Sequence, residues 1–261
     1  MMKFFAGKEE ALSPAIREHS KRVRHALTDG DPQSLPRSRH ELGKALHLGA
    51  PHPLHPGWPE STPALRLRDG AVVRLRPIQK SDGAAWITQR LKDEGVLRSV
   101  EPTVANSWRE THSPRGWRLM YATMRHLAKH GEVVPLAIEL DGRFVGQLTL
   151  GGIHHGTASE CWIGYWVYSA YAGRGIATAA CALGTDHALM RVGIHRITAT
   201  YLPDNPASQA VLQRCGYRHE GYLRKNLHID GRWRDHNLMA LVAEDYPDSA
   251  ALRLRRVGYF R

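Results

Sequence analysis

The sequence predicts an α+β fold, in which a mixed, mostly antiparallel sheet of about seven strands is flanked by helices. Short runs of alternating apolar and polar residues, joined by Asp-Gly turns at 141–142 and 230–231, are typical of antiparallel hairpins. One strand pattern leads instead through a glycine-rich turn, 171–178, into a long helical pattern, as in a crossover connection. This order favours a mixed sheet over a doubly wound parallel one.

The first half of the pattern gives a strand, two helices and a hairpin. Residues 72–77 alternate and stop at a proline, and Ser81 then starts a helix of about three turns. Pro114 opens a longer helix with apolar residues at spacings of three and four, and Gly131 ends it. The hairpin strands are expected at 133–140 and 144–150.

The second half contains the crossover and a closing pair of strands. A strand is expected over 158–167, before the glycine-rich turn. The helix after the turn has one expected inner face, formed by Ile176, Ala180, Leu183 and His187. The remaining elements are a strand at 195–201, a helix at 207–215 and strands at 217–227 and 233–242.

This pattern divides the chain into four parts. Residues 1–50 predict an N-terminal extension, weakly helical or disordered, because their two short helical patterns carry no strong apolar stripe. Residues 51–65 are rich in proline and predict a linker or an extended wrap over the domain. The folded domain is expected over 66–247, followed by a basic C-terminal tail over 248–261.

Composition limits the class of protein. With 261 residues and 42% hydrophobic content, the chain can build one substantial core. No apolar run approaches the roughly 18 residues of a membrane span, and the first residues do not predict a secretory signal. Cys161, Cys181 and Cys215 are odd in number and lack metal-ligand spacing. We therefore expect a protein of the reducing cytoplasm, with no disulfide framework, no metal and no membrane partner.

The formal charge of +11 leaves the partner open. An excess of Lys and Arg attracts nucleic acid, a ribosomal surface or a polyanionic cofactor. An arginine-rich composition on a solvated face is an equally good interpretation. Charge alone therefore does not separate a nucleic-acid-binding protein from other classes.

The glycine-rich turn is the strongest candidate for a binding site. Gly173 and Gly175 let the backbone approach a ligand closely and adopt left-handed dihedral angles. The turn places bare N–H groups at the start of a helix, where they and the helix dipole can bind a diphosphate. Two glycines at this spacing also occur in ordinary turns, so the interpretation depends on the motifs around them.

Two further motifs flank the turn. Ile163-Gly164-Tyr165-Trp166-Val167 precedes it, and Asn205-Pro206-Ala207-Ser208 with Cys215-Gly216-Tyr217 follows it. In this order and separation, the three motifs resemble those of the GNAT superfamily of acetyl-CoA-dependent N-acetyltransferases. The RimJ/RimL-like branch, which acetylates the N-termini of ribosomal proteins, is the most similar. The resemblance covers about residues 71–245.

The resemblance implies acetyl-CoA as the donor and assigns its binding site. The pantetheine arm would lie along the strand that ends at Val167 and Tyr168, and the diphosphate on the amides of the turn. Asn205 would cap its helix and also hydrogen-bond the pantetheine arm, and Arg174 would add charge near the 3′-phosphate. Ala172 replaces a polar residue of the family's turn, which matters little because backbone amides bind the phosphates. The implied cofactor-binding residues are Val167, Tyr168, Gly173, Arg174, Gly175, Ile176, Ala177, Thr178, Asn205 and Ser208.

The catalytic residues follow less directly. Amide formation requires a neutral amine, a donor to the oxyanion and a proton for the leaving thiolate. Glu160 is the candidate general base, acting through water, although an acid at a strand end is equally often only solvated. The backbone N–H near Val167 is the expected oxyanion donor. The family's best-known members have a tyrosine acid where this chain has Leu212, so Ser208, water or another tyrosine would protonate the thiolate.

The acceptor side is the least determined part. Adjacent His154 and His155 point to opposite faces of a strand and do not predict a shared metal site. Aromatic and acidic side chains on the expected acceptor side fit a peptide end or a cationic small molecule, although tryptophans more often pack in a core. These side chains are Trp86, Trp108, Trp117, Trp233, Glu94, Glu101 and Glu110.

The sequence therefore predicts an enzyme, an acetyl-CoA-dependent N-acetyltransferase that acts on the N-terminal α-amine of a protein, with ribosomal proteins as the expected targets. A small amine, such as an aminoglycoside or a polyamine, is the alternative acceptor. A non-catalytic CoA-binding or RNA-binding module, which contacts the ribosome through its basic surface, is the alternative from a different class.

Overall fold

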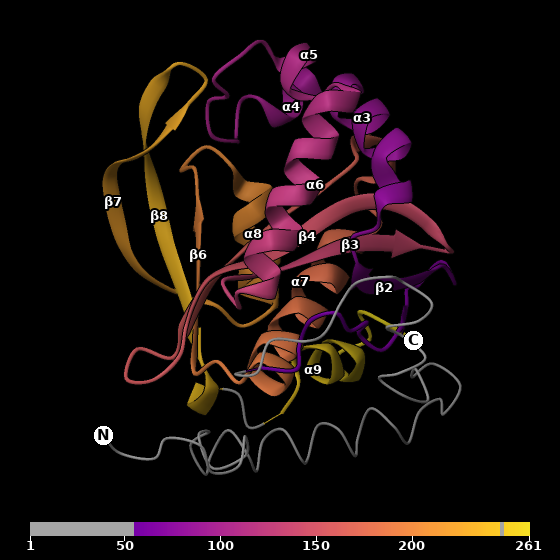
Figure 1. The fold of residues 1–261 in the computed structure, drawn as a ribbon. Helices are drawn as coiled ribbons and strands as arrows, with labels where there is room; N and C mark the ends of the chain where they lie inside the picture. The colour runs from indigo at the N-terminus through magenta and orange to yellow at the C-terminus, as the bar shows by residue number, and fades with distance from the viewer. Residues whose placement is uncertain (1–54, 246–247) are drawn as a thin grey trace, which may run out of the picture.

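The fold is centred on one mixed sheet, in a computed structural model that describes residues 55–245 and 248–261 (Figure 1). The spatial order is β1-β2-β3-β4-β5-β6-β8-β7, and every neighbouring pair is antiparallel except β5 and β6. The predicted α+β class is confirmed. The described residues form eight strands rather than about seven, because β1 is too short to give an alternating pattern. The strands are β1 (Leu65–Arg66), β2 (Val72–Pro77), β3 (Val133–Leu140), β4 (Arg143–His154), β5 (Glu160–Val167), β6 (Arg196–Tyr201), β7 (Arg218–Ile229) and β8 (Arg232–Val242).

Helices cover both faces of the sheet. α3 and α6 pack on β4 and β3 from one side, whereas α7 lies against β2, β4 and β5 on the other (Figure 1). No helix in the described residues has the length and hydrophobicity needed to cross a membrane. The helices are α3 (Gly83–Lys92), α4 (Glu94–Leu97), α5 (Trp108–Thr111), α6 (Pro114–Lys129), α7 (Ile176–His187), α8 (Pro206–Arg214) and α9 (Ala250–Arg256). The extension predicted over 1–50 lies outside the described residues.

A separate aromatic cluster fills the space between α3, α5, α6 and the sheet. Trp86, Trp108 and Trp117 are buried there. The indole N–H of Trp108 donates to the Arg90 carbonyl at 2.8 Å, so its polar group is also satisfied. Three of the four tryptophans considered for the acceptor side are therefore core residues.

Helix α7 is buried on all sides, and not on one face as the sequence predicted. Every residue of α7 except Ala177 is buried. The loop before β1 covers the C-terminal end of α7: the His187 ring donates to the Gly57 carbonyl at 2.6 Å, and Arg191 pairs with Glu60 at 2.8 Å. The described part of residues 51–65 is therefore an extended wrap over the domain.

The C-terminal segment, which the sequence predicted to be a basic tail, packs on α7 as helix α9. The Asp186 carboxylate accepts hydrogen bonds from the Ser249 hydroxyl at 2.6 Å and the Ala250 amide at 2.7 Å. Burial raises the pKa of Asp186 to about 6. Beyond α9, Phe260 is buried and bridges to Leu67 beside β1. The segment is short and its inner face is mostly alanine, so its apolar periodicity is weak in the sequence.

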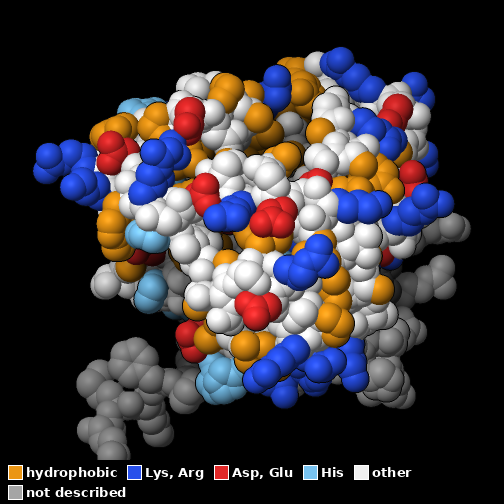
Figure 2. Space-filling view, turned by 90° about the horizontal axis from the view of Figure 1, so that it is seen from above, with side chains coloured by type: hydrophobic (Ala, Val, Ile, Leu, Met, Phe, Trp, Pro, Cys, Tyr) orange, Lys and Arg blue, Asp and Glu red, His pale blue; other side chains and the backbone are white. Residues whose placement is uncertain are grey.

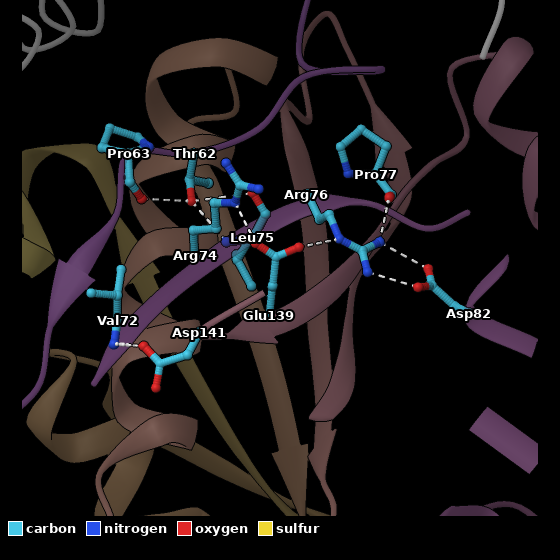
Figure 3. Close-up of polar contacts among 10 residues, drawn as sticks. All are labelled: Thr62, Pro63, Val72, Arg74, Leu75, Arg76, Pro77, Asp82, Glu139 and Asp141. Atoms are coloured by element: carbon cyan, nitrogen blue, oxygen red, sulfur yellow. Dashed lines mark hydrogen bonds and ion pairs between the residues drawn. The ribbon is translucent and has the colours of Figure 1, made fainter. Parts of the chain in front are cut away.

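A buried ion-pair network joins β2 and β3 to the start of α3 (Figure 3). Arg76 donates to Glu139 at 2.6 Å and to Asp82 at 2.7 Å, and Arg74 reaches Glu139 at 2.7 Å. Burial alone would raise the pKa of Glu139, but the two guanidinium groups hold it below its ordinary value of 4.5. Loss of Arg76 would leave the buried Asp82 carboxylate without a cationic partner, so Arg76 is the central residue of this network.

Candidate active site

Strands β5 and β6 separate along their length and leave a gap in the sheet. They pair at three positions, of which Trp162–Thr198 is the last. β5 continues to Val167 and β6 to Tyr201 without further pairing between them. Backbone groups that a complete sheet would satisfy therefore face the gap, which is the opening expected for the pantetheine arm.

The amide of Val167 points into this gap, and the amide of Tyr168 does not. The Tyr168 N–H donates to the Val145 carbonyl of β4 at 2.9 Å. Successive amides of a strand point in opposite directions, so the Val167 N–H faces away from β4 and toward β6. Gly146 allows the two strands to approach closely here, because a Cβ at this position would lie 2.2 Å from the Trp166 carbonyl oxygen. Of the two predicted strand-end residues, Val167 has a backbone N–H that faces the gap, and Tyr168 does not.

The glycine-rich turn forms a nest of amides at the start of α7. Gly173 and Gly175 have φ angles of 77° and 82°, in the left-handed region that favours glycine. No side chain caps the helix at Gly175. In the part of the chain that the structure describes, the N–H groups from Gly173 to Thr178 donate to no backbone carbonyl. Six unpaired donors at the positive end of a helix fit a diphosphate.

The first turn of α8 faces β5. Asn205 caps α8, since its side-chain oxygen accepts from the Ser208 amide at 3.1 Å. The Ser208 hydroxyl interacts with the phenol of Tyr165 in β5, although the buried phenol oxygen makes no hydrogen bond of good geometry among the described residues. Burial raises the pKa of Tyr165 well above its ordinary value, so the phenol keeps its proton. Leu212, further along α8, is buried in the core.

The side chain of Arg174 in the turn already has a partner. Its guanidinium contacts the Asp69 carboxylate at 2.6 Å. Hydrogen bonds from the Ala71 amide and from Arg174 hold the pKa of Asp69 below its ordinary value. The turn therefore carries little net charge from its own arginine.

Glu160 lies at the closed end of the gap. It is the first residue of β5 and is paired with Arg196 of β6. Val167 is seven positions further along β5, which at about 3.3 Å per residue is roughly 23 Å of strand. The structure therefore does not bring Glu160 to the Val167 amide, and one water molecule does not span that distance.

Trp162, which is not among the predicted site residues, lies where the gap opens. Its side chain is 45% exposed on the sheet face opposite α7. The indole packs directly on β4, because a Cβ at Gly151 would lie 2.1 Å from the ring and one at Gly152 would lie 3.0 Å from it. A glycine pair facing a tryptophan on the next strand is the sequence signal for this arrangement, and it depends on knowing the register.

The sequence pattern also gives no indication that His236 in β8 belongs to the site. β8 pairs with β6 at Tyr201–Asn237, so His236 lies just past the end of β6, on the same face as Trp162. Its Nδ1 is 3.1 Å from the Arg234 carbonyl, which can only accept, so Nδ1 carries the proton and Nε2 the lone pair. Burial lowers the pKa of His236 below 6.5, so the ring is neutral near pH 7.

The α4–α5 loop and the β7–β8 hairpin close the acceptor side. Arg98 pairs with Asp230 at 2.7 Å, and the Thr103 amide donates to the His228 carbonyl at 2.8 Å. Trp233 on this hairpin is 60% exposed, unlike the three buried tryptophans.

The acidic and histidine side chains considered for the acceptor side have local partners. Glu94 pairs with Arg98, Glu101 with Arg90, and Glu110 with the Ser107 hydroxyl. His154 is exposed and its Nδ1 donates to the Gly152 carbonyl at 2.9 Å. The described residues contain no group of three or more side chains placed to hold a metal ion.

The chain is similar to acetyltransferases in both sequence and structure. Residues 73–218 match the profile of the acetyltransferase (GNAT) domain. The chain is 38% identical over 178 residues to the probable N-acetyltransferase YjcK of Bacillus subtilis, covering 67% of this chain and 97% of that protein. It is 28% identical over 194 residues to the ribosomal protein uS5-alanine N-acetyltransferase of Escherichia coli, covering 73% and 97%. The solved structure of Mycobacterium smegmatis RimJ in complex with CoA-disulfide is 47% identical, with a TM-score of 0.77, covering 79% of this chain and 99% of that one.

Proposed function

The chain belongs to the GNAT acetyltransferase family, and we propose that it acetylates the N-terminal α-amine of a ribosomal protein that begins with alanine. The observation that carries the proposal is the β5–β6 gap with a nest of unpaired amides beside it. The choice of acceptor is supported by the relatives, one of which is named for the alanine of uS5 and another as RimJ.

The donor side of the gap consists of groups suited to acetyl-CoA, which supplies an activated thioester when bound. The amides from Gly173 to Thr178 would hold its diphosphate. The pantetheine arm would pair with the unpaired backbone of β5 and with the NH₂ group of Asn205. The Val167 N–H would then donate to the carbonyl oxygen on which negative charge develops.

Proton transfer requires a base on the acceptor side and an acid on the donor side. His236 is a better candidate base than Glu160, because its Nε2 carries a lone pair near the open end of the gap. The base would take a proton from the substrate ammonium before the amine attacks. Ser208, with the protonated Tyr165 phenol beside it, is placed to donate a proton to the leaving thiolate. The second proton, which the nitrogen of the tetrahedral intermediate loses as the amide forms, would restore the donor hydroxyl through water.

A peptide end fits the acceptor side better than a polycationic antibiotic does. An aminoglycoside would need several free carboxylates, and the acidic side chains considered there already pair with Arg98, Arg90 and Ser107. The exposed indole of Trp162 offers an apolar surface at the gap instead. Such a surface suits the small apolar side chain of an N-terminal alanine and the backbone that follows it.

Mass spectrometry of a synthetic peptide with the organism's own uS5 N-terminus tests this proposal. We expect one acetyl group on the free α-amine in the presence of acetyl-CoA, and none on a matched peptide whose α-amine is blocked. Turnover with an aminoglycoside panel and not with peptides would refute the ribosomal acceptor. Binding of acetyl-CoA without turnover of any amine would favour the non-catalytic module.

A ribosome-binding basic surface has weaker support. Figure 2 shows Lys and Arg side chains in several separate groups on the face seen from above, with acidic and apolar side chains between them. A scattered arrangement is typical of a solvated face, whereas RNA backbones bind continuous basic stripes. On this face, the net charge of +11 does not form one patch.

A further inference from the structure

We propose that Arg68, Arg214 and Tyr259 form a subsite for the 3′-phosphate of coenzyme A. The three residues come from the β1–β2 turn, the end of α8 and the C-terminal segment. Arg68 and Tyr259 lie outside the part of the chain that matches the acetyltransferase profile. The inference rests on the proposed function, because it assumes that acetyl-CoA binds at the glycine-rich turn.

The Tyr259 ring lies close to both arginines and to Gly175 of the amide nest. The guanidinium carbon of Arg68 is 5.4 Å from the ring centroid, and that of Arg214 is 5.5 Å from it. Both distances are within the range of cation–π contacts. A Cβ built on Gly175 would lie 3.8 Å from Cε1 of the same ring. Two guanidinium groups are thus held near Gly175, the residue immediately before α7.

Hydrogen bonds connect the three residues to the C-terminal segment. Arg68 Nε donates to the Gly258 carbonyl at 2.7 Å, and the Tyr259 amide donates to the Leu254 carbonyl at 2.8 Å. The side chain of Arg253 on α9 donates to the Arg214 carbonyl. The C-terminal segment is therefore tied to both arginines by hydrogen bonds, and α9 serves to position them.

The positive charges of Arg68 and Arg214 favour a bound anion near Tyr259. Arg174 in the turn is paired with Asp69, whereas neither Arg68 nor Arg214 forms a salt bridge with any carboxylate of the described residues. Two like charges near one ring repel each other unless an anion lies between or beside them. A phosphate monoester carries up to two negative charges and accepts the forked hydrogen bonds that guanidinium groups donate.

The position of the cluster selects the 3′-phosphate among the phosphates of coenzyme A. The amide nest from Gly173 to Thr178 already provides donors for the diphosphate. The 3′-phosphate is the other anionic group of the same ligand, on the ribose beyond the diphosphate. A cluster that adjoins the nest but does not overlap it is therefore placed for that group.

Calorimetric titration of coenzyme A against 3′-dephospho-coenzyme A tests the subsite. We expect the unmodified protein to bind coenzyme A at least about tenfold more tightly, as charge-assisted hydrogen bonds predict. The double variant Arg68→Ala/Arg214→Ala should bind both ligands with the affinity that the unmodified protein has for the dephospho form. The matched control Arg115→Ala/Arg118→Ala removes two exposed charges on α6 and should keep the full preference.

The outcomes separate the subsite from the proposed function. If the unmodified protein binds neither ligand, the donor assignment itself fails. If it binds both equally, or if Arg68→Ala/Arg214→Ala keeps the preference, only the subsite is refuted. A Tyr259→Leu variant should reduce the preference by about two- to fivefold, the value of an exposed cation–π contact, and thermal unfolding of each variant checks that α9 remains folded.

Discussion

The donor side and the acceptor side of the β5–β6 gap are built by different means. The donor side is mostly backbone: amides at the start of α7 and the Val167 N–H, presented by left-handed glycines and by a strand without a partner. The proposed acceptor side consists of side chains, Trp162 and His236, from strands that the sheet brings together. The first recognises a ligand shared by a whole family, and the second must recognise one substrate.

This difference predicts where a substitution will act. A backbone site is damaged only by changes in chain conformation or by a new charge beside it. A side-chain site is damaged by removing one group while the fold remains intact. Donor variants should therefore change the affinity for coenzyme A, and acceptor variants should change turnover or peptide affinity alone.

The largest effect is expected from Gly175→Glu. Gly175 has a φ of 82°, and its N–H belongs to the amide nest. The glutamate would strain the backbone and place a negative charge beside the diphosphate, so affinity for acetyl-CoA should fall by at least about 100-fold. Calorimetry measures the loss directly.

Gly156→Glu is the matched control for that variant. Gly156 also has a left-handed φ, 85°, and nothing lies within 4 Å of a Cβ built there. It precedes β5, at the opposite end of the strand from the turn. Its backbone strain is therefore comparable, and acetyl-CoA affinity should be unchanged. Equal losses in both variants would mean that strain, and not the phosphate site, explains the result.

His236→Gln should have the next largest effect, on catalysis and not on the donor. Loss of a general base typically lowers the rate by about 100-fold or more, while acetyl-CoA affinity should not change. Because the pKa of His236 is lowered by burial, protonation should inactivate the enzyme only below pH 6.5, and kcat/KM should fall there. The residual kcat/KM of the His236→Gln variant should therefore show no fall below pH 6.5.

His219→Gln, on the neighbouring strand β7, is the control for the histidine variant. His219 is exposed and contacts Asn237 at 3.4 Å. It should retain both the rate and the pH profile. If His236→Gln keeps the fall in kcat/KM below pH 6.5, another group is the base.

The sequence locates the turn and the cap proposed for the donor side but not the side chains proposed for the acceptor side, and the reason is distance along the chain. The glycine-rich turn and the Asn205 cap are local features, whose conformation depends on residues within one or two turns. His236 and Trp162 share a face only through the register of β5, β6 and β8. Glu160 was chosen for its residue type at a strand end, and the strand pairing places it at the closed end of the gap. A local pattern does not contain these pairings.

Trp162→Ala also tests the acceptor side, and its expected effect is smaller than that of His236→Gln. The substitution removes the exposed indole from the Gly151–Gly152 surface and should raise the KM for the peptide by about tenfold. Acetyl-CoA affinity should stay constant. Leu119→Ala, which removes a 69% exposed apolar side chain on α6, is the control and should change neither value. A rise in acetyl-CoA Kd for Trp162→Ala would place this residue on the donor side.

The smallest effect is expected from Tyr165→Phe, which removes a single side-chain hydroxyl from the donor side. The Tyr165 hydroxyl is buried without a hydrogen bond of good geometry among the described residues, and such a group costs stability in the free protein. Its removal should therefore raise the free energy of unfolding by about 1 kcal/mol in the absence of ligand. If the phenol assists Ser208 in protonating the thiolate, kcat should fall by about threefold, because water can replace it in part.

In Tyr165→Phe, the free energy of unfolding should rise while kcat falls only if the hydroxyl takes part in catalysis. A variant that is more stable and slower would show that the fold tolerates an unsatisfied donor because the bound state uses it. Lower stability would mean that the hydroxyl has a partner in the free protein. Higher stability with unchanged kcat would leave Ser208 or water as the acid, and the Tyr165 hydroxyl would then have no part in catalysis.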